Sequence, residues 1–284
     1  MMSEDGKTET MFVERTVPTA RYGITEQIQG TSEAELAAES LRNVGYAVLD
    51  AGYDAAGLQA LQAEFERVRH AYIDHFGEER LRRLNEFHTV RSPLTLDSRS
   101  FLDLALNTAL LDTLRCTITG TFILNQQNAL VNPPGEAYSQ AAWHRDLPYQ
   151  HFVASRPIAI NALFCVDDFT SQNGATFILP ASHKSEKFPS DEYVRRNALQ
   201  VEAKAGSFIL LDCMLYHCGG INSSPLQRRA VNHVFAIPYL KQQINIPANL
   251  ASAALTPRDQ AILGFGHQEP ASVDAYFAQR ESRQ

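Results

Sequence analysis

The first third of the chain has the hydrophobic spacing of amphipathic helices. Ser32 and Glu35 form a Ser-x-x-Glu pattern just before an apolar repeat, which predicts a capped helix start. A second helix is predicted from apolar residues three or four positions apart, and a third over about Ser100 to Arg115. The stripe of the second helix is Leu58, Leu61, Phe65, Val68 and Tyr72. The segment GYAVLD, residues 45–50, predicts a short strand between the first two helices.

After Thr121 the pattern changes to short β-rich runs that are separated by clusters of Gly, Pro, Asn, Asp and Ser. Strands at such spacing, without alternating helices, predict an antiparallel sandwich or small barrel. The expected fold is mainly β with helical additions: a double-stranded β-helix of the jelly-roll or cupin class, with N-terminal helices packed on one sheet. The runs are TFILNQQNALVN, PIAINALFCV, ATFILP, SFILLDCMLYH and RAVNHVFAIPYL.

The same patterns predict the domain boundaries. Residues 1–30 are polar and are expected to be a partly flexible N-terminus, and residues 31–284 are expected to form a single domain. Within it, helices should occupy about residues 32–115 and the β-helix core about residues 121–240. Residues 241–284, with a helix start near Pro257, should form a C-terminal cap.

Composition narrows the class of protein. The chain has 284 residues, 44% of them hydrophobic, which is enough for a full core, and its net charge of -7 argues against a nucleic-acid partner. No apolar run approaches the roughly 20 residues of a membrane span, and the polar N-terminus lacks a signal-peptide pattern. The four cysteines form no CxxC pair, so we expect reduced thiols and a cytoplasmic location. The expected partner is a small-molecule substrate, bound by a monomer or homodimer.

The sharpest chemical signal is the sequence Trp143-His144-Arg145-Asp146. Residues i and i+2 of a strand face the same side, so the imidazole of His144 and the carboxylate of Asp146 should lie together. A second histidine, His217, ends the run FILLDCMLYH. Two histidines and one carboxylate on one face of a metal leave positions open, which is the facial triad of non-haem iron(II) oxygenases. The sequence therefore predicts that these three residues bind iron and form the catalytic centre.

A cation is expected near this site. Arg228 follows His217 by eleven residues, and the intervening segment CGGINSSPLQ is rich in turn-forming residues. The strand that begins at Arg228 should therefore run back beside the metal strand, and its guanidinium fork could bind the far carboxylate of a 2-oxo acid. Arg229 should point to the opposite side of that strand.

Together these elements resemble the phytanoyl-CoA dioxygenase-like family of iron(II)- and 2-oxoglutarate-dependent oxygenases. The resemblance covers roughly residues 35 to 240 and lies in GYAVLD, NPPG (132–135), WHRD (143–146), CVDDFTSQNGATFILPASHK (165–184) and the block from His217 to Arg228. It implies a double-stranded β-helix in which His144, Asp146 and His217 bind Fe(II) and Arg228 binds 2-oxoglutarate. It also implies O₂ as co-substrate, with hydroxylation of a substrate C–H bond as the default reaction and succinate and CO₂ as products.

The chain departs from the family where many members have Ser or Thr two residues after the distal histidine, because Gly219 stands there. Thr176 or Asn128 is expected to help bind 2-oxoglutarate instead. Tyr149, Gln150 and His151 follow the metal motif and are expected to line the substrate pocket.

Polar residues dominate this expected pocket, since Gln126, Gln127 and Asn128 are further candidates for its wall. Hydrogen-bonding side chains of this kind favour a small polar natural product, a carbohydrate or a related metabolite over a fatty chain.

Two alternatives stay open on the sequence alone. A metal-dependent isomerase or epimerase of the cupin type would need the metal ligands but no 2-oxo acid, and it would give Arg228 no required role. A β-sandwich binding protein without catalytic activity would need neither, although nothing structural requires the spacing of His144, Asp146 and His217.

Overall fold

The computed structural model describes residues 17–136, 139–147, 152–250 and 253–281. The chain divides after Gly30 into two compact units. In the first unit, residues 17–30 contain no helix or strand, and the second unit, which begins at Thr31, holds all the elements described below. Among the described residues, no helix is both long and apolar enough to cross a bilayer.

The predicted helices of the first third are present. Helix α1 (Glu33–Val44) begins at Ser32, whose side chain accepts the backbone N–H of Glu35 in the predicted capping box. Gly45 ends it in a left-handed conformation with φ 87°, and strand β1 (Tyr46–Asp50) follows. Helix α2 (Ala55–Phe76) buries Leu61, Phe65 and Val68, and α3 (Glu78–Arg83) was not predicted.

The third predicted helix is wrong as a single element, because the chain forms two helices there. Helix α4 (Arg99–Ala105) ends before Asn107, and α5 (Thr108–Thr117) begins after it. The side-chain Oδ1 of Asn107 accepts the N–H of Leu110, and its side-chain Nδ2 donates to the backbone carbonyl of Ala51 at 2.8 Å. This N-cap interrupts a helix whose apolar spacing continues on both sides.

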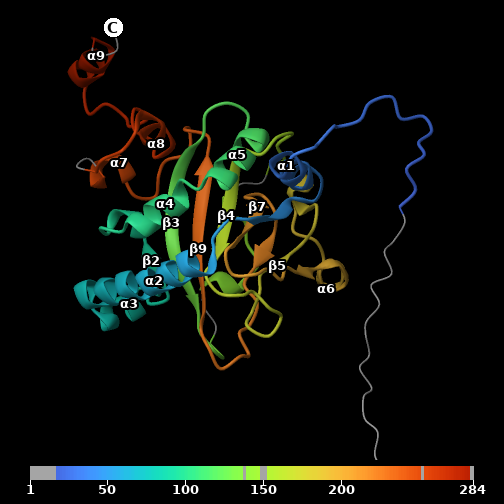
Figure 1. Cartoon of the computed structure of the whole chain (residues 1–284), viewed down its shortest axis with the longest axis horizontal. Coiled ribbons are helices and arrows are strands. Elements are labelled where there is room, and N and C mark those ends of the chain that lie inside the picture. The colour runs from blue at the N-terminus through green and yellow to red at the C-terminus, as the bar shows by residue number, and fades with distance from the viewer. Residues whose placement is uncertain (1–16, 137–138, 148–151, 251–252, 282–284) are drawn as a thin grey trace, which may run out of the picture. The chain divides into compact units, whose positions relative to one another are not determined.

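The β-rich part forms two antiparallel sheets, and they do not close into a single barrel. The larger sheet has the order β1-β7-β4-β9-β3-β2, and the smaller one has the order β6-β5-β8. Figure 1 shows the long central strands of the larger sheet behind helices α2, α4 and α5. The remaining strands are β2 (Thr89–Arg91), β3 (Ile123–Asn132), β4 (Ala159–Cys165), β5 (Phe177–Ile178), β6 (Leu199–Gln200), β7 (Ser207–Asp212), β8 (His217–Cys218) and β9 (Arg228–Ala236).

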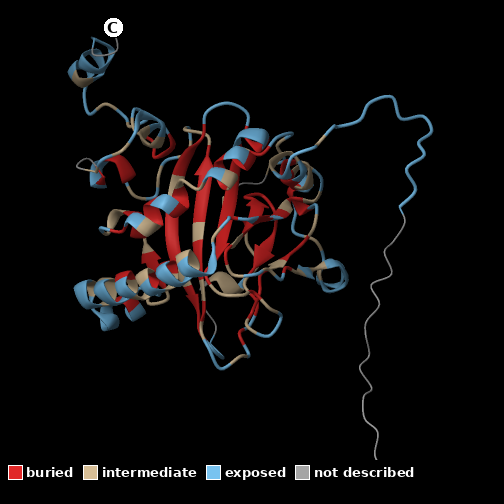
Figure 2. Cartoon of the chain, viewed as in Figure 1, coloured by how far each residue is buried: buried red, intermediate tan, exposed pale blue. Residues whose placement is uncertain are grey.

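The two faces of the larger sheet have different roles. On the outer face, Phe164, Phe208 and Phe235 pack with apolar residues of the N-terminal helices in one continuous core, which Figure 2 shows as buried strands beneath amphipathic helices. The inner face turns toward the smaller sheet and carries a second core around Leu163 and Ile209. The predicted fold, a double-stranded β-helix with helices on one sheet, is therefore confirmed.

The C-terminal segment packs beside the same outer core. Helix α7 (Ile246–Asn249) and helix α8 (Pro257–Ile262) contribute Ile246 and Ile262 to that core. The predicted helix start near Pro257 is correct, with Thr256 as its N-cap. Helix α6 (Asp191–Asn197) and helix α9 (Val273–Glu281) have no buried residues and were not predicted.

Candidate metal centre and adjoining cleft

The two histidines of the motif are backbone partners. The N–H of His144 donates to the carbonyl of His217 at 2.9 Å, and the N–H of His217 donates back to the carbonyl of His144 at 3.1 Å. Residues that exchange both hydrogen bonds lie directly opposite each other, with side chains on the same face. Their ring centroids are accordingly 4.3 Å apart. The bridge joins His144 to β8, although His144 lies in an isolated bridge and not in the extended strand that the sequence analysis assumed.

Both imidazole rings are oriented by backbone carbonyl groups. His144 Nδ1 donates to the carbonyl of Ala142 at 2.7 Å, and His217 Nδ1 donates to that of Leu215 at 3.0 Å. With the proton on Nδ1, each Nε2 keeps a free lone pair for a metal. Burial and the neighbouring imidazole of His217 lower the pKa of His144, which favours the neutral, ligating form.

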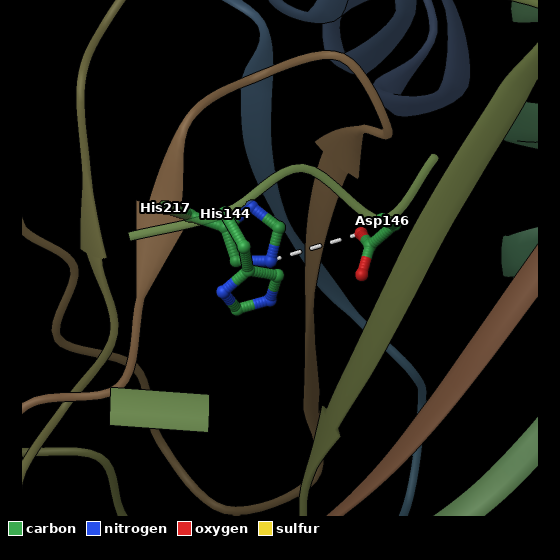
Figure 3. A group of neighbouring side chains, drawn as sticks. All are labelled: His144, Asp146 and His217. Carbon is green, nitrogen blue, oxygen red and sulfur yellow. Dashed lines mark ion pairs between the residues drawn. The ribbon is translucent and has the colours of Figure 1, made fainter. Parts of the chain in front are cut away.

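The carboxylate of Asp146 completes the group (Figure 3). Its Oδ2 lies 3.7 Å from Nε2 of His217, and one ligand atom from each of the three residues falls within 4.8 Å of the others. Asp146 lies in a bend, and its backbone N–H donates to the carbonyl of Cys213 at 3.1 Å. The three residues expected to bind iron are thus brought together, with two nitrogen atoms and one oxygen atom on one side of a small space.

A cleft with an empty volume of about 450 Å³ adjoins these ligands. Arg228 and Thr176 line it together with His144 and His217. Arg228 is only 4% exposed, and its guanidinium carbon lies 3.9 Å from the centroid of the Phe169 ring. The neighbouring Arg229 points to the other side of β9 as predicted, where it pairs with Asp167 at 2.6 Å.

A tight turn fixes the floor of this cleft. Gly174 has φ 77°, and a Cβ there would lie 2.4 Å from the carbonyl oxygen of Gly220, so only glycine fits. The amide group of Asn132 donates to that same carbonyl at 3.0 Å. The Asn-Gly turn is thereby packed against the segment between His217 and Arg228, and it places Thr176 in the wall of the cleft.

The other predicted site residues divide into three groups. Asn128 lies on β3 and is buried, on the same side of the strand as Leu130, a residue that lines the cleft. Gln127 does not face the pocket: its amide group donates to the carbonyl of Phe101 and contacts His233 on the helix side of the sheet. The prediction that Gln127 lines the pocket wall together with Asn128 was wrong, because neighbouring strand residues point to opposite faces. The expected substrate residues Tyr149, Gln150 and His151 lie outside the described residues.

Two asparagines of the cleft were missed by the sequence analysis. Asn161 on β4 and Asn232 on β9 both line it. The amide group of Asn161 donates to Oδ2 of Asp146 at 2.8 Å. A signal existed, since Asn161 is the only polar residue in the buried strand sequence AINALFC. A lone buried amide in such a strand requires a partner.

Comparison with known proteins decides the family. The family model of phytanoyl-CoA dioxygenase matches residues 41–230. The chain belongs to the phytanoyl-CoA dioxygenase family. It is also 30% identical over 270 residues to the uncharacterized protein Rv1501 of Mycobacterium tuberculosis, a match that covers 92% of this chain and 97% of that protein. A shorter match, 26% identical over 151 residues, joins half of the chain to half of the iron/alpha-ketoglutarate-dependent dioxygenase ausO of Aspergillus calidoustus.

Solved structures agree on the fold. EctD from S. alaskensis, solved with bound iron, superposes with a TM-score of 0.62 at 21% identity, over 76% of this chain and 82% of that one. The alpha-ketoglutarate-dependent epimerase SnoN from nogalamycin biosynthesis superposes with a TM-score of 0.57 at 18% identity, over 79% of this chain and 90% of that one. At these identities the likeness concerns the double-stranded β-helix.

Family membership confirms the enzyme class and the cofactors that the resemblance in the sequence implied. The chain is a dioxygenase of the non-haem iron, 2-oxoglutarate-dependent class, with Fe(II) and 2-oxoglutarate as its cofactor and co-substrate.

Proposed function

We propose that this dioxygenase oxidises, by hydroxylation, a C–H bond of a small polar natural product, a carbohydrate or a related metabolite. The single observation that carries the proposal is the convergence of His144, Asp146 and His217, whose ligand atoms lie within 4.8 Å of one another at the edge of a cleft. When bound, Fe(II) and 2-oxoglutarate activate O₂ for oxidation of the substrate, with release of succinate and CO₂.

The donor set of the site fits Fe(II). Both histidines keep Nε2 free because Nδ1 is held by a backbone carbonyl, and Asp146 supplies a carboxylate oxygen. Two imidazole nitrogens and one carboxylate are the ligands that such oxygenases use while leaving positions for co-substrates. We therefore assign His144, Asp146 and His217 as the iron ligands.

The cleft fits 2-oxoglutarate. Arg228 is buried at its wall, and a guanidinium fork can bind a carboxylate in a bidentate manner. The hydroxyl group of Thr176 lies in the same wall, so it can take the place of the family's usual Ser or Thr at Gly219. We assign Arg228 and Thr176 to co-substrate binding. Asn128, the other predicted residue, does not line this cleft and remains a prediction for the same role.

The side chains around the ligands support a polar substrate. The side-chain carbonyl oxygens of Asn161 and Asn232, which line the cleft, are buried without a hydrogen-bond partner among the residues that the structure describes. Unmet buried acceptors of this kind indicate a ligand or water that supplies hydrogen-bond donors. Ionised 2-oxoglutarate carries acceptors only, whereas a hydroxylated substrate carries donors. Tyr149, Gln150 and His151 remain the proposed substrate contacts from the loop after the metal motif.

A metal-dependent isomerase or epimerase without a 2-oxo acid would require no carboxylate-binding group in the cleft, whereas Arg228 lines it. The sequence also favours a cytoplasmic enzyme, and the cysteines Cys116, Cys165, Cys213 and Cys218 are all free thiols, as expected in a reducing compartment.

The proposal is tested by succinate release. Purified protein with Fe(II), 2-oxoglutarate and O₂ should be screened against a library of polar metabolites, and hits should be analysed for a product that gains one oxygen atom. We expect succinate and product in equal amounts, and loss of both in His144→Ala and Asp146→Ala. Product formation without succinate would contradict the proposal and favour the isomerase.

A further inference from the structure

Among the described residues 139–147 of its own segment, none donates a hydrogen bond to the carboxylate of Asp146, which gets its partner from another strand. Asp146 lies in a bend between the isolated bridge residue His144 and a part of the chain that is not described. Its backbone is held by the hydrogen bond to Cys213, but that bond leaves the side-chain torsions free. A metal ligand must be held within a few tenths of an ångström of its working position, which requires a second shell of contacts.

Asn161 supplies this contact from a central strand of the larger sheet. It lies on β4, which pairs with β7 on one side and β9 on the other, and all seven residues of β4 are buried. The Asn161 side chain is 2% exposed, and its Nδ2 donates to Oδ2 of Asp146 at 2.8 Å. That oxygen is also the carboxylate atom 3.7 Å from Nε2 of His217.

The orientation of the Asn161 amide is fixed by its partner. An ionised carboxylate only accepts hydrogen bonds, so the NH₂ group of Asn161 must face Asp146. Its carbonyl oxygen then faces away and is buried without a partner among the described residues. A buried amide with one end unmet is a cost to folding, and here it occurs in a strand that is otherwise apolar. The cost is explained if the other end holds a metal ligand in place.

We propose that Asn161 is a positioning residue that orients the Asp146 carboxylate for the metal. This inference rests on the proposed metal site, and it assigns to the chain a determinant of metal affinity that lies outside the ligand triad. It also gives a role to the one polar side chain of β4, which lies opposite Leu211 and Val234 in the sheet.

The test compares Asn161→Leu with Asn232→Leu. Leucine has the same branching at Cγ as asparagine, although it is larger, and it cannot donate a hydrogen bond. Asn232 lines the same cleft from β9, and no described residue of the ligand triad is hydrogen-bonded to its side chain. Fe(II) affinity is measured by anaerobic equilibrium dialysis, and the unfolding temperature is measured for each metal-free protein and again with saturating Fe(II).

We expect Asn161→Leu to bind Fe(II) about 10- to 100-fold more weakly than wild type, as for other losses of an outer-shell partner, and Asn232→Leu to bind as wild type does. The metal-free variants should unfold close to the wild-type temperature, and the rise on adding Fe(II) should shrink in Asn161→Leu only. If Asn161→Leu does not fold, Asn161→Ala removes the same donor without adding bulk and is read in the same way.

Two results would overturn the inference. One is an Asn161 variant whose Fe(II) affinity lies within twofold of wild type. The other is an equal loss in the Asn161 and Asn232 variants, which would indicate a general effect of cleft polarity. Wild-type protein that binds no Fe(II) would instead contradict the metal site itself, and the inference with it, so the two failures are distinguishable.

Discussion

The guanidinium carbon of Arg145 lies 3.9 Å from the centroid of the Tyr216 ring, so the residue after His144 is stacked on the residue before His217. Because neighbouring residues of an extended chain point to opposite sides, the two histidines face the cleft while Arg145 and Tyr216 face away from it. On the side away from the cleft, this stack joins the two chain segments that carry the proposed metal ligands.

The same pair holds the segment after Pro180. The Arg145 guanidinium donates to the carbonyls of Ser182, Ser185 and Glu186, and the Tyr216 hydroxyl donates to that of Glu186 at 3.0 Å. Burial lowers the pKa of Arg145. Its two terminal nitrogens nevertheless donate to three backbone carbonyls, which makes Arg145 a structural group and not a pocket residue.

We predict that Arg145→Ala lowers the free energy of unfolding by roughly 2–4 kcal/mol, because it removes several charge-assisted hydrogen bonds and leaves buried carbonyls unmet. Urea unfolding of the metal-free protein measures this. The control is Arg196→Ala, since the Arg196 side chain is 75% exposed and pairs with Glu192 on the surface, where the loss should stay below about 1 kcal/mol. Equal losses in both variants would contradict the structural role of Arg145.

Replacing Arg228 tests the co-substrate site. Arg228→Lys keeps the charge but loses the planar fork, so we expect the KM for 2-oxoglutarate to rise about tenfold or more. The control is Arg229→Lys, because the Arg229 guanidinium pairs with Asp167 and Glu66 on the other face of β9. Steady-state kinetics with varied 2-oxoglutarate gives both values. An unchanged KM in Arg228→Lys would remove Arg228 from the co-substrate site.

His233 makes stability depend on pH. Its ring is buried, its Nδ1 donates to the carbonyl of Ala162 at 3.0 Å, and Nε2 accepts from the amide of Gln127 at 2.8 Å. The Gln127 orientation is set because its carbonyl oxygen accepts the N–H of Leu94. Burial lowers the pKa of His233 from 6.5 to about 4. The neutral ring is therefore the form that the fold accepts.

Because the pKa of His233 is lower in the folded protein than in the unfolded chain, the free energy of unfolding falls as the pH falls. As pH falls below 6.5 the unfolded chain takes up the proton first, so the stability contributed by neutral His233 is complete above that pH and is lost down to about pH 4. We expect a loss of about 3 kcal/mol over this range. Asp212 acts in the opposite direction, because burial raises its pKa to about 6.

Because His233 and Asp212 act in opposite directions, the pH dependence of the unfolding free energy is compared between wild type and His233→Gln. Unfolding free energies at several pH values should show a flatter profile in His233→Gln than in wild type, whatever its offset. His70→Gln replaces an exposed histidine and serves as the control. Parallel profiles for wild type and His233→Gln would contradict the buried neutral ring.

The sequence was most informative where a local signal fixes an element. The Ser32–Glu35 capping box placed the first helix. The strand at Arg228 is present, but its predicted place beside the strand that ends at His217 is wrong, because β9 pairs with β3 and β4. The sequence was least informative where a single side chain breaks a regular pattern, as Asn107 does between α4 and α5, where one helix was predicted. The three-residue edge strand β2 carries no periodicity from which it could be recognised.

The same division holds for the site. Order and spacing were enough to bring His144, Asp146 and His217 into one hypothesis, because His144 and Asp146 are two residues apart and His217 ends a predicted strand. Asn161 could not be linked to Asp146 in this way, since the hydrogen bond joins two elements that only the tertiary fold brings together. Gln127 was wrongly expected to line the pocket, because its polar character alone does not tell which face of β3 it occupies.

The central claim is that one iron is held by two imidazoles and one carboxylate beside Arg228. An anaerobic crystal structure with Fe(II) and 2-oxoglutarate, with anomalous data collected at the iron edge, tests it most directly. We predict one strong anomalous peak bound by Nε2 of His144, Nε2 of His217 and a carboxylate oxygen of Asp146, with the far carboxylate of 2-oxoglutarate on Arg228. A peak elsewhere, or iron bound without any one of these three residues, would contradict it.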